Sequence, residues 1–249
     1  MAEAAVLAYR QWRLERRMFW RNPTAAFFSF TLPLLFLFLF GAIFSGDQKT
    51  LNVIVPGILG MSVMSTTFNA LAMNITFLRE EGVLKRMHGT PMPPISYLGG
   101  VTANAVSNAT VQIVIVVLAG KVFFGLGWPK DWLELAVFCV AGVSTLAALG
   151  VAFSHIIPNF DAAPAYTNIV FLPVIFISGV FYDVDTAPQF LRDVAQVLPL
   201  THIINGVSAA MVTGESLADN LGNLAVVVAW GIFGAFFAVR GFSWQAKRD

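Results

Sequence analysis

The chain has 249 residues, of which 57% are hydrophobic and 12% charged, whereas average proteins have roughly 45–50% and about 25%. The formal net charge of +1 gives no reason to expect a nucleic-acid partner. With one cysteine, Cys139, the chain can form neither an internal disulfide nor a cysteine-rich metal site. The apolar residues are gathered into long stretches, which excludes an ordinary soluble domain and indicates an integral membrane protein.

The N-terminal segment, residues 1–23, is predicted to be an amphipathic helix at the inner membrane surface. At 100° per residue one side of the helix carries Arg10, Arg13, Arg17 and Arg21, and the other side carries Leu7, Trp12, Leu14, Met18 and Phe19. Such a helix places its apolar face among the lipid headgroups and its arginines on anionic lipid. The arginines could equally be a plain positive-inside anchor, or the helix could also touch a partner protein.

Residues 24–249 are predicted to form a domain of six transmembrane helices. Six stretches lack Asp, Glu, Lys and Arg, and each holds the roughly 20 apolar residues that a helix needs to cross about 30 Å of hydrocarbon. The expected spans are residues 24–44, 51–77, 95–120, 135–157, 164–181 and 221–239. No alternating pattern typical of barrel strands is present. The predicted fold is therefore an all-α integral membrane protein.

The basic residues are distributed unevenly over the predicted loops. Those expected on the inner side are Arg10, Arg13, Arg16, Arg17, Arg21, Arg79, Lys85, Arg86, Arg240, Lys247 and Arg248. Those expected on the outer side are Lys49, Lys121, Lys130 and Arg192. Because cytoplasmic loops are enriched in Lys and Arg, both termini are predicted to be cytoplasmic.

A short charged segment, residues 79–94, follows the second predicted span and reads REEGVLKRMHGTPMPP. Glu81 and Lys85 are four residues apart in the order that favours a helix. Gly89 can end that helix, and the prolines after it prevent its continuation into the third span. The segment is therefore predicted to be a compact helical projection on the inner face, although most loops of this kind are simply solvated.

A longer segment, residues 182–220, separates the fifth and sixth predicted spans on the outer side. Residues 187–198 can form an amphipathic helix, and the apolar stretch 203–212 is too short to cross a membrane. We expect a pair of re-entrant or interfacial extracytoplasmic helices, whose irregular backbone must be covered by protein or water.

The chain contains no motif for catalysis or for nucleotide binding. It lacks G-x-x-x-x-G-K-[ST], G-x-S-x-G and H-E-x-x-H, so we expect no enzymatic activity, no cofactor and no metal in this chain. Transporters driven by protons or ions generally carry ionisable groups within their spans, and the predicted spans have none. Energy for transport would therefore have to come from outside the spans.

The second predicted span carries a polar stripe that could line a path for substrate. Ser62, Ser65, Thr66, Asn69 and Thr76 recur at three- and four-residue spacing. Met and Phe side chains flank the stripe and suit a loosely specific apolar ligand. The candidate path residues are Met61, Met64, Ser65, Phe68, Asn69 and Met73, with Phe171 and Phe176 in the fifth span. Hydroxyl residues in a bundle more often only hold helices together.

Three features of the chain together resemble membrane subunits of type-2 ATP-binding cassette exporters. They are the charged segment, the basic N-terminal helix and residues 178–207, which read SGVFYDVDTAPQFLRDVAQVLPLTHIINGV. The chain is most similar to the branch that contains the daunorubicin- and multidrug-export permeases. The resemblance extends over essentially the whole chain, and the order and spacing of the motifs are more specific than any one of them.

The resemblance implies a half-transporter in the plasma membrane that exports an apolar or amphipathic small molecule, drug-like or lipid-like. It would pair with a second permease copy, identical or different, and with two copies of an ATPase subunit that binds ATP and Mg. The charged segment would be the coupling helix that docks on the ATPase, and spans two and five would line the route. The docking residues by position would be Glu80, Glu81, Gly82, Lys85, Arg86 and Thr90.

Other functions remain open at the level of sequence. A permease of the same architecture could export a glycan or a lipid-linked polymer, which would require a path lined with aromatic and polar groups along its length. A membrane scaffold or assembly protein would satisfy all of its span polarity within one subunit. A self-sufficient secondary carrier is disfavoured by the missing intramembrane charges.

Overall fold

The computed structural model describes residues 2–89 and 93–241, in which every secondary-structure element is helical. Four helices are long and apolar enough to cross a membrane, namely Gln48–Glu80, Ser96–Phe124, Trp132–Ser154 and Leu221–Arg240. Two shorter apolar helices, Phe30–Ile43 and Ala163–Ile177, coincide with the first and fifth predicted spans. The structure thus confirms an all-helical membrane protein in its described part.

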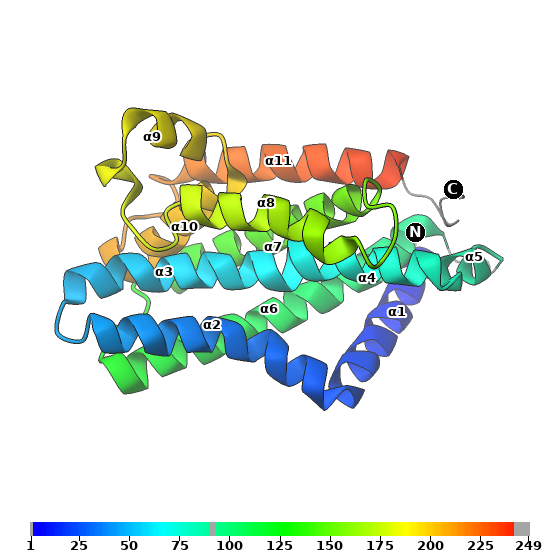
Figure 1. Ribbon diagram of the computed structural model, residues 1–249, viewed down its shortest axis with the longest axis horizontal. Helices are drawn as coiled ribbons and strands as arrows, with labels where there is room; N and C mark the ends of the chain where they lie inside the picture. Colours follow the sequence, from blue (N-terminus) through cyan, green and yellow to red (C-terminus); the bar gives the residue numbers. More distant parts are fainter. Residues whose placement is uncertain (1, 90–92, 242–249) are drawn as a thin grey trace.

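The first helix, α1 (Ala2–Arg21), lies obliquely to the bundle and packs against α6 (Pro94–Phe124) (Figure 1). Trp12 Nε1 donates a hydrogen bond to Ser107 Oγ at 3.0 Å. Within residues 4–21 of α1 the buried side chains are those of Gln11 and Glu15, joined by a 2.7 Å hydrogen bond. Leu14 and Met18 on the predicted apolar face stay about half exposed. The apolar face is therefore available to lipid.

The second predicted span forms the centre of the molecule. It consists of α3 (Gln48–Met64), a π-helical turn η1 (Ser65–Asn69) and α4 (Ala70–Glu80) in one continuous helix. The helix α2 (Pro23–Ile43) packs against α3 on one side, and α7 (Trp132–Ser154) packs against η1 and α4. Gly150 of α7 allows this approach, because a Cβ there would lie 2.6 Å from the Phe68 carbonyl oxygen.

The remaining helices complete the two ends of the bundle. The short α5 (Val83–His88) lies at one end, and α8 (Ala163–Ile177) runs beside η1 and α4. At the opposite end η2 (Val184–Thr186) and α9 (Gln189–Ala195) lead into α10 (Pro199–Ser208), which continues as η3 (Ala209–Thr213). The last helix, α11 (Leu221–Arg240), packs mainly against α7.

The segment between α8 and α11 turns back on itself. The axes of α9 and the α10–η3 helix are bent by 89°, so the pair is either a broken span or a re-entrant loop. The His202 ring is within hydrogen-bond distance of Asn223 Oδ1 at 2.7 Å and of the Gln196 carbonyl at 2.8 Å, and Trp230 Nε1 donates to the Val197 carbonyl at 2.9 Å. These bonds fasten the bent pair to α11.

The contact at Gly150 generates a stability prediction. The substitution Gly150→Ala should lower the thermal unfolding midpoint of the purified protein, because its methyl group meets backbone atoms of Phe68, at a cost of about 1–3 kcal/mol. Gly99→Ala on α6 is the matched control, since its Cβ would meet only Ala8 Cβ at 3.7 Å. Equal midpoints for both variants would contradict the packing of α7 on η1.

Candidate coupling surface and transport path

The charged segment after the second span folds as a turn and a short helix. Gly82 adopts a left-handed backbone conformation, with φ of +66°, which favours glycine and ends α4. The chain then forms α5, and Gly89 closes it with a hydrogen bond from its N–H to the Arg86 carbonyl at 3.2 Å. The helix is shorter than the predicted segment 79–94, because Glu81 lies in the turn rather than in the same helix as Lys85.

One buried side chain anchors α5 to the bundle. Leu84 is fully buried in a cluster with Ile75 of α4 and with Tyr97 and Val101 of α6. A six-residue helix has too few internal hydrogen bonds to be stable alone. Its position therefore depends on this apolar contact and on the two helices that flank it.

The predicted docking residues that the structure describes lie together in the turn and helix of residues 80–86. The side chains of Glu80, Glu81, Lys85 and Arg86 are exposed and Gly82 is half-buried, whereas Thr90 lies outside the described residues. Glu80 Oε2 also accepts a hydrogen bond from the Phe160 N–H at 2.5 Å. Two acidic and two basic side chains are therefore exposed within seven residues of the chain. The helix α5 lies at one end of the molecule (Figure 1).

A buried arginine joins this projection to the other helices. Arg79 is only 3% exposed and donates from Nη1 to the Ser154 carbonyl at 3.0 Å and from Nη2 to the Ile157 carbonyl at 2.6 Å. A cation at the C-terminus of α7 is favoured by the helix dipole. Together with the Glu80–Phe160 bond, these contacts form what we call the Arg79 clasp, which connects the end of α4, just before α5, to the end of α7 and the loop that leads into α8. Sequence reasoning treated Arg79 only as a cytoplasmic positive charge.

The eight predicted path residues do not share one cavity. Met64 and Phe68 line an apolar cavity of about 530 Å³ together with Val170 and Val174 of α8 and residues of α7, α10 and α11. The others are distributed as follows: Met61 and Phe171 are buried in the core, Ser65, Asn69 and Met73 are half-buried, and Phe176 is 57% exposed. The cavity residues contributed by α11 were not predicted.

Most of the polar stripe on the second span is satisfied by its own helix. Ser62, Thr66 and Thr76 donate to the carbonyls of Ile58, Ser62 and Ala72 at 2.6, 2.8 and 2.8 Å. Hydroxyl groups bonded back in this way need no partner on another helix. Asn69 is different, because its buried Oδ1 has no hydrogen-bond partner among the described residues.

Aromatic rings connect α2 and α8 near the end of the bundle that, by the sequence prediction, faces outward. Phe181, just after α8, lies with its ring centroid 5.8 Å from that of Phe36, 5.2 Å from Phe40 and 5.7 Å from Phe176. These four residues form what we call the outer aromatic cluster. It joins two helices that flank the second span, and only Phe176 of its members was a predicted path residue.

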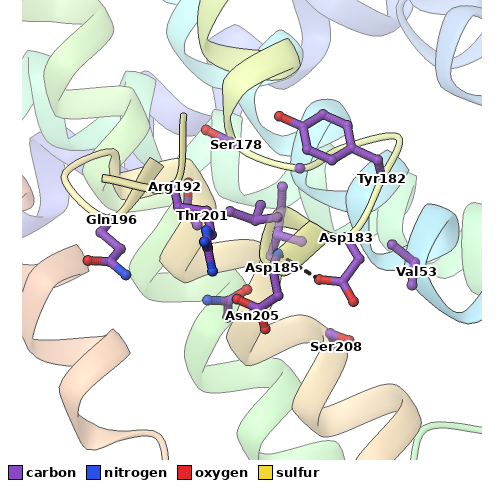
Figure 2. Close-up of a pocket in the computed structure, with 13 residues that line it drawn as sticks. Val53, Ser178, Tyr182, Asp183, Asp185, Arg192, Gln196, Thr201, Asn205 and Ser208 are labelled. Atoms are coloured by element: carbon purple, nitrogen blue, oxygen red, sulfur yellow. Dashed lines mark hydrogen bonds between the residues drawn. The ribbon is translucent and has the colours of Figure 1, made fainter. Parts of the chain in front are cut away.

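A polar cavity of about 250 Å³ lies beneath the bent helix pair. Figure 2 shows Gln196 and Arg192 on one side of it and Tyr182 and Asp183 on the other. The Ser178 and Thr201 hydroxyls that line it are buried and have no hydrogen-bond partner in the described part of the chain. Such groups suit ordered water or a polar ligand.

Comparison with known proteins agrees with this architecture. The family model for ABC-2 type transporters matches residues 4–212. The chain is similar to the inner membrane transport permease YadH of Escherichia coli (strain K12), at 22% identity over 63% of this chain and 60% of that protein. It is also similar to the linearmycin resistance permease protein LnrN of Bacillus subtilis (strain 168), at 21% identity over 68% and 43%.

A third relative is nodulation protein J of Rhizobium leguminosarum bv. trifolii, at 29% identity over 46% of this chain and 45% of that protein. The chain thus aligns with less than two thirds of the length of each of these three relatives. The match to the family model, by contrast, covers most of this chain. Together with the membrane-length helices, it shows that the chain belongs to the ABC-2 type transporter family, as a multi-pass membrane permease subunit.

Proposed function

We propose that this permease subunit exports an apolar or amphipathic small molecule and that a separate ATPase subunit drives it. The observation that carries the proposal is the Arg79 clasp, which joins an exposed charged projection to a helix beside the apolar cavity. In the four membrane-length helices, charged side chains occur only within the first or last few residues. The middle of such spans offers no charged group for ion coupling.

The proposed topology has six spans, formed by α2, α3–η1–α4, α6, α7, α8 and α11. The excess of basic residues on one side supports cytoplasmic termini in the plasma membrane. In this orientation α1 lies at the inner interface, α5 projects into the cytoplasm, and the α9–α10 pair is re-entrant from the outside. The shortness of the apolar stretches in α2 and α8 is compatible with local thinning of the bilayer or with association of subunits.

The proposed assembly contains two permease copies and two ATPase subunits, each of which binds ATP and Mg. The family implies an ATP-binding cassette partner, and the exposed charges of α5 are suited to docking one. Large apolar side chains on α2 and α8 are available for the second copy, which is identical in the simplest assembly: Leu32, Leu35, Leu39, Ile169, Leu172 and Phe176.

The proposed mechanism follows the connections in the fold. Closure of the ATPase pair on ATP displaces α5, and the Arg79 clasp transmits this displacement to the C-terminus of α7 and the start of α8. The tilt of α8 separates Phe176 and Phe181 from Phe36 and Phe40, which opens the outer aromatic cluster. Substrate then leaves past the bent helix pair.

The unsatisfied amide oxygen of Asn69 disfavours a purely structural scaffold, in which each buried polar group would be satisfied within the subunit. The apolar cavity favours a small apolar molecule over a glycan, because its lining offers almost no polar partner for hydroxyl groups.

Charge reversal on α5 tests the docking surface. We expect Lys85→Glu to weaken binding of the cognate ATPase subunit by about tenfold, equivalent to about 1.4 kcal/mol, because it places an acid where a base is recognised. Affinity can be measured by titrating the purified subunits in nanodiscs. The control is Lys49→Glu, the same exposed change at the proposed outer side, which should leave the affinity unchanged; an equal loss in both variants would refute docking at α5.

Loss of the Arg79 clasp should uncouple hydrolysis from transport. In Arg79→Met the carbonyls of Ser154 and Ile157 lose their donor, so the clasp is broken and we expect export to fall by about tenfold or more. The exposed charges of α5 are unchanged, so we expect assembly and basal ATP hydrolysis to stay normal. Export of a fluorescent amphiphile from vesicles measures this, with Arg240→Met at the exposed end of α11 as control. Full export by an assembled Arg79→Met complex would contradict the mechanism.

Cysteine labelling tests the topology. In a Cys139→Ser background, Ser45→Cys and Thr186→Cys should react in intact cells with a membrane-impermeant maleimide, because both positions are exposed on the proposed outer side. Arg86→Cys should react only after permeabilisation. Labelling of position 86 in intact cells would show that the orientation is reversed.

A further inference from the structure

A second large cavity lies at the opposite end of the second span from the outer aromatic cluster. It has a volume of about 510 Å³ and is enclosed by α1, the start of α2, the η1–α4 helix and α6. One wall is apolar and includes Phe19, Phe30 and Leu78, and the other is polar and includes Glu15, Asn104 and Asn108. We call it the inner cavity. None of its lining residues was a predicted path residue.

The inner cavity lies at the depth of α1. The hydrogen bond from Trp12 Nε1 to Ser107 Oγ holds α1 beside the part of α6 that carries Asn104 and Asn108. Arg13, Arg17 and Arg21 of α1 are exposed. If α1 lies at the inner membrane surface, as in the proposed topology, the polar wall is at headgroup level and the apolar wall faces the acyl chains.

The polar wall presents hydrogen-bond acceptors that lack donors. Asn108 is 8% exposed, and its buried Oδ1 has no hydrogen-bond partner among the described residues. The Oδ1 atom of Asn104, one helical turn earlier, is also buried and also has no hydrogen-bond partner among the described residues. A buried acceptor without a donor is destabilising, since water has been removed and nothing replaces it. The two amide oxygens are therefore available to accept hydrogen bonds from a donor that enters the cavity.

The rest of the wall restricts which donor fits. The Glu15 carboxyl lines the cavity and accepts a hydrogen bond from Gln11 Nε2 at 2.7 Å. Burial raises the pKa of Glu15, against the opposing effect of the Gln11 bond. No Lys or Arg is among the described residues that line the cavity, so it lacks a counter-charge for a phosphate. The wall is therefore suited to the amine of an amphiphile, and a phosphate of the same molecule would have to lie outside it.

We propose that the inner cavity binds a membrane phospholipid with a primary-amine head, of the phosphatidylethanolamine class. Its ammonium group donates hydrogen bonds to the amide oxygens of Asn104 and Asn108, and one acyl chain lies along Phe19, Phe30 and Leu78. A choline head carries the same charge but has no N–H group, so it cannot satisfy these acceptors. The site is separate from the proposed export path and requires neither ATP nor the ATPase subunit.

Native mass spectrometry of the full chain tests this directly. The purified protein is equilibrated with equal amounts of phosphatidylethanolamine and phosphatidylcholine that have the same acyl chains. We expect the wild-type chain to retain the ethanolamine lipid over the choline lipid by about fivefold or more, and Asn104→Leu/Asn108→Leu to lose this preference. Asn168→Leu, at an exposed position of α8, is the matched control and should keep it.

Three results would overturn the proposal: equal retention of both lipids by the wild-type chain, an unchanged preference in the double variant, or the same loss in the Asn168→Leu control.

A parallel titration compares tetradecylamine with tetradecyltrimethylammonium, which share chain and charge but differ in N–H donors. Binding of tetradecylamine without retention of the ethanolamine lipid would reject the lipid as occupant and indicate a single-chain amine instead. Circular dichroism and elution volume confirm that the double variant is folded.

Discussion

The architecture depends on one buried guanidinium group. Arg79 lies at the α5 end of the central helix, where it is almost completely buried and donates to two carbonyls at the end of α7 and just after it. A buried cation without partners is strongly destabilising, so α4 and the α7–α8 loop cannot separate at this point without a large loss of free energy. An edge-to-face contact between the rings of Phe77 and Phe160, with centroids 5.1 Å apart, reinforces the same junction. Two parts of the chain that are 75 residues apart are thus held in direct contact.

In the proposed mechanism this constraint gives the short helix α5 a mechanical role. Alone, α5 would be too short to hold its shape, but Leu84 seats it on the bundle and the Arg79 clasp fixes its base. The exposed charges on α5 can then transmit force rather than merely attract a partner. The membrane-length helices, with charges only near their ends, provide no alternative source of energy. In the proposed function, a permease subunit of this construction depends on an ATPase that binds α5.

Much of the fold could be predicted from the sequence, because charge-free stretches of membrane length and the Gly89 break are local signals. The positions of α6, α7 and α11 therefore agree closely with prediction. The break at Gly82 was missed, since the spacing of Glu81 and Lys85 predicted one helix across it.

The Arg79 contacts could not be predicted, since no periodicity reports a side chain bound to carbonyls from a distant helix. The burial of Gln11 and Glu15 in place of Leu14 was also missed, because it depends on the space left by Gly100 on the facing helix, where a Cβ would lie 2.5 Å from Gln11 Cβ. The path residues were only partly located, because residue type alone does not tell which side chains line a cavity. Met64 and Phe68 line the apolar cavity, whereas Met61 and Phe171, chosen on the same grounds, are buried in the core.

The most direct test of the central claim is a distance measurement during the ATPase cycle. Spin labels at Lys85 on α5 and Ala165 on α8, both exposed positions, report across the Arg79 clasp, and a second pair at Ala165 and Leu39 reports between α8 and α2. Double electron–electron resonance would compare the nucleotide-free complex with the vanadate-trapped one. The clasp predicts that the α5–α8 distance stays constant while the α8–α2 distance changes. A change in the α5–α8 distance with α8 and α2 fixed would show that α5 moves independently and would contradict the proposed coupling.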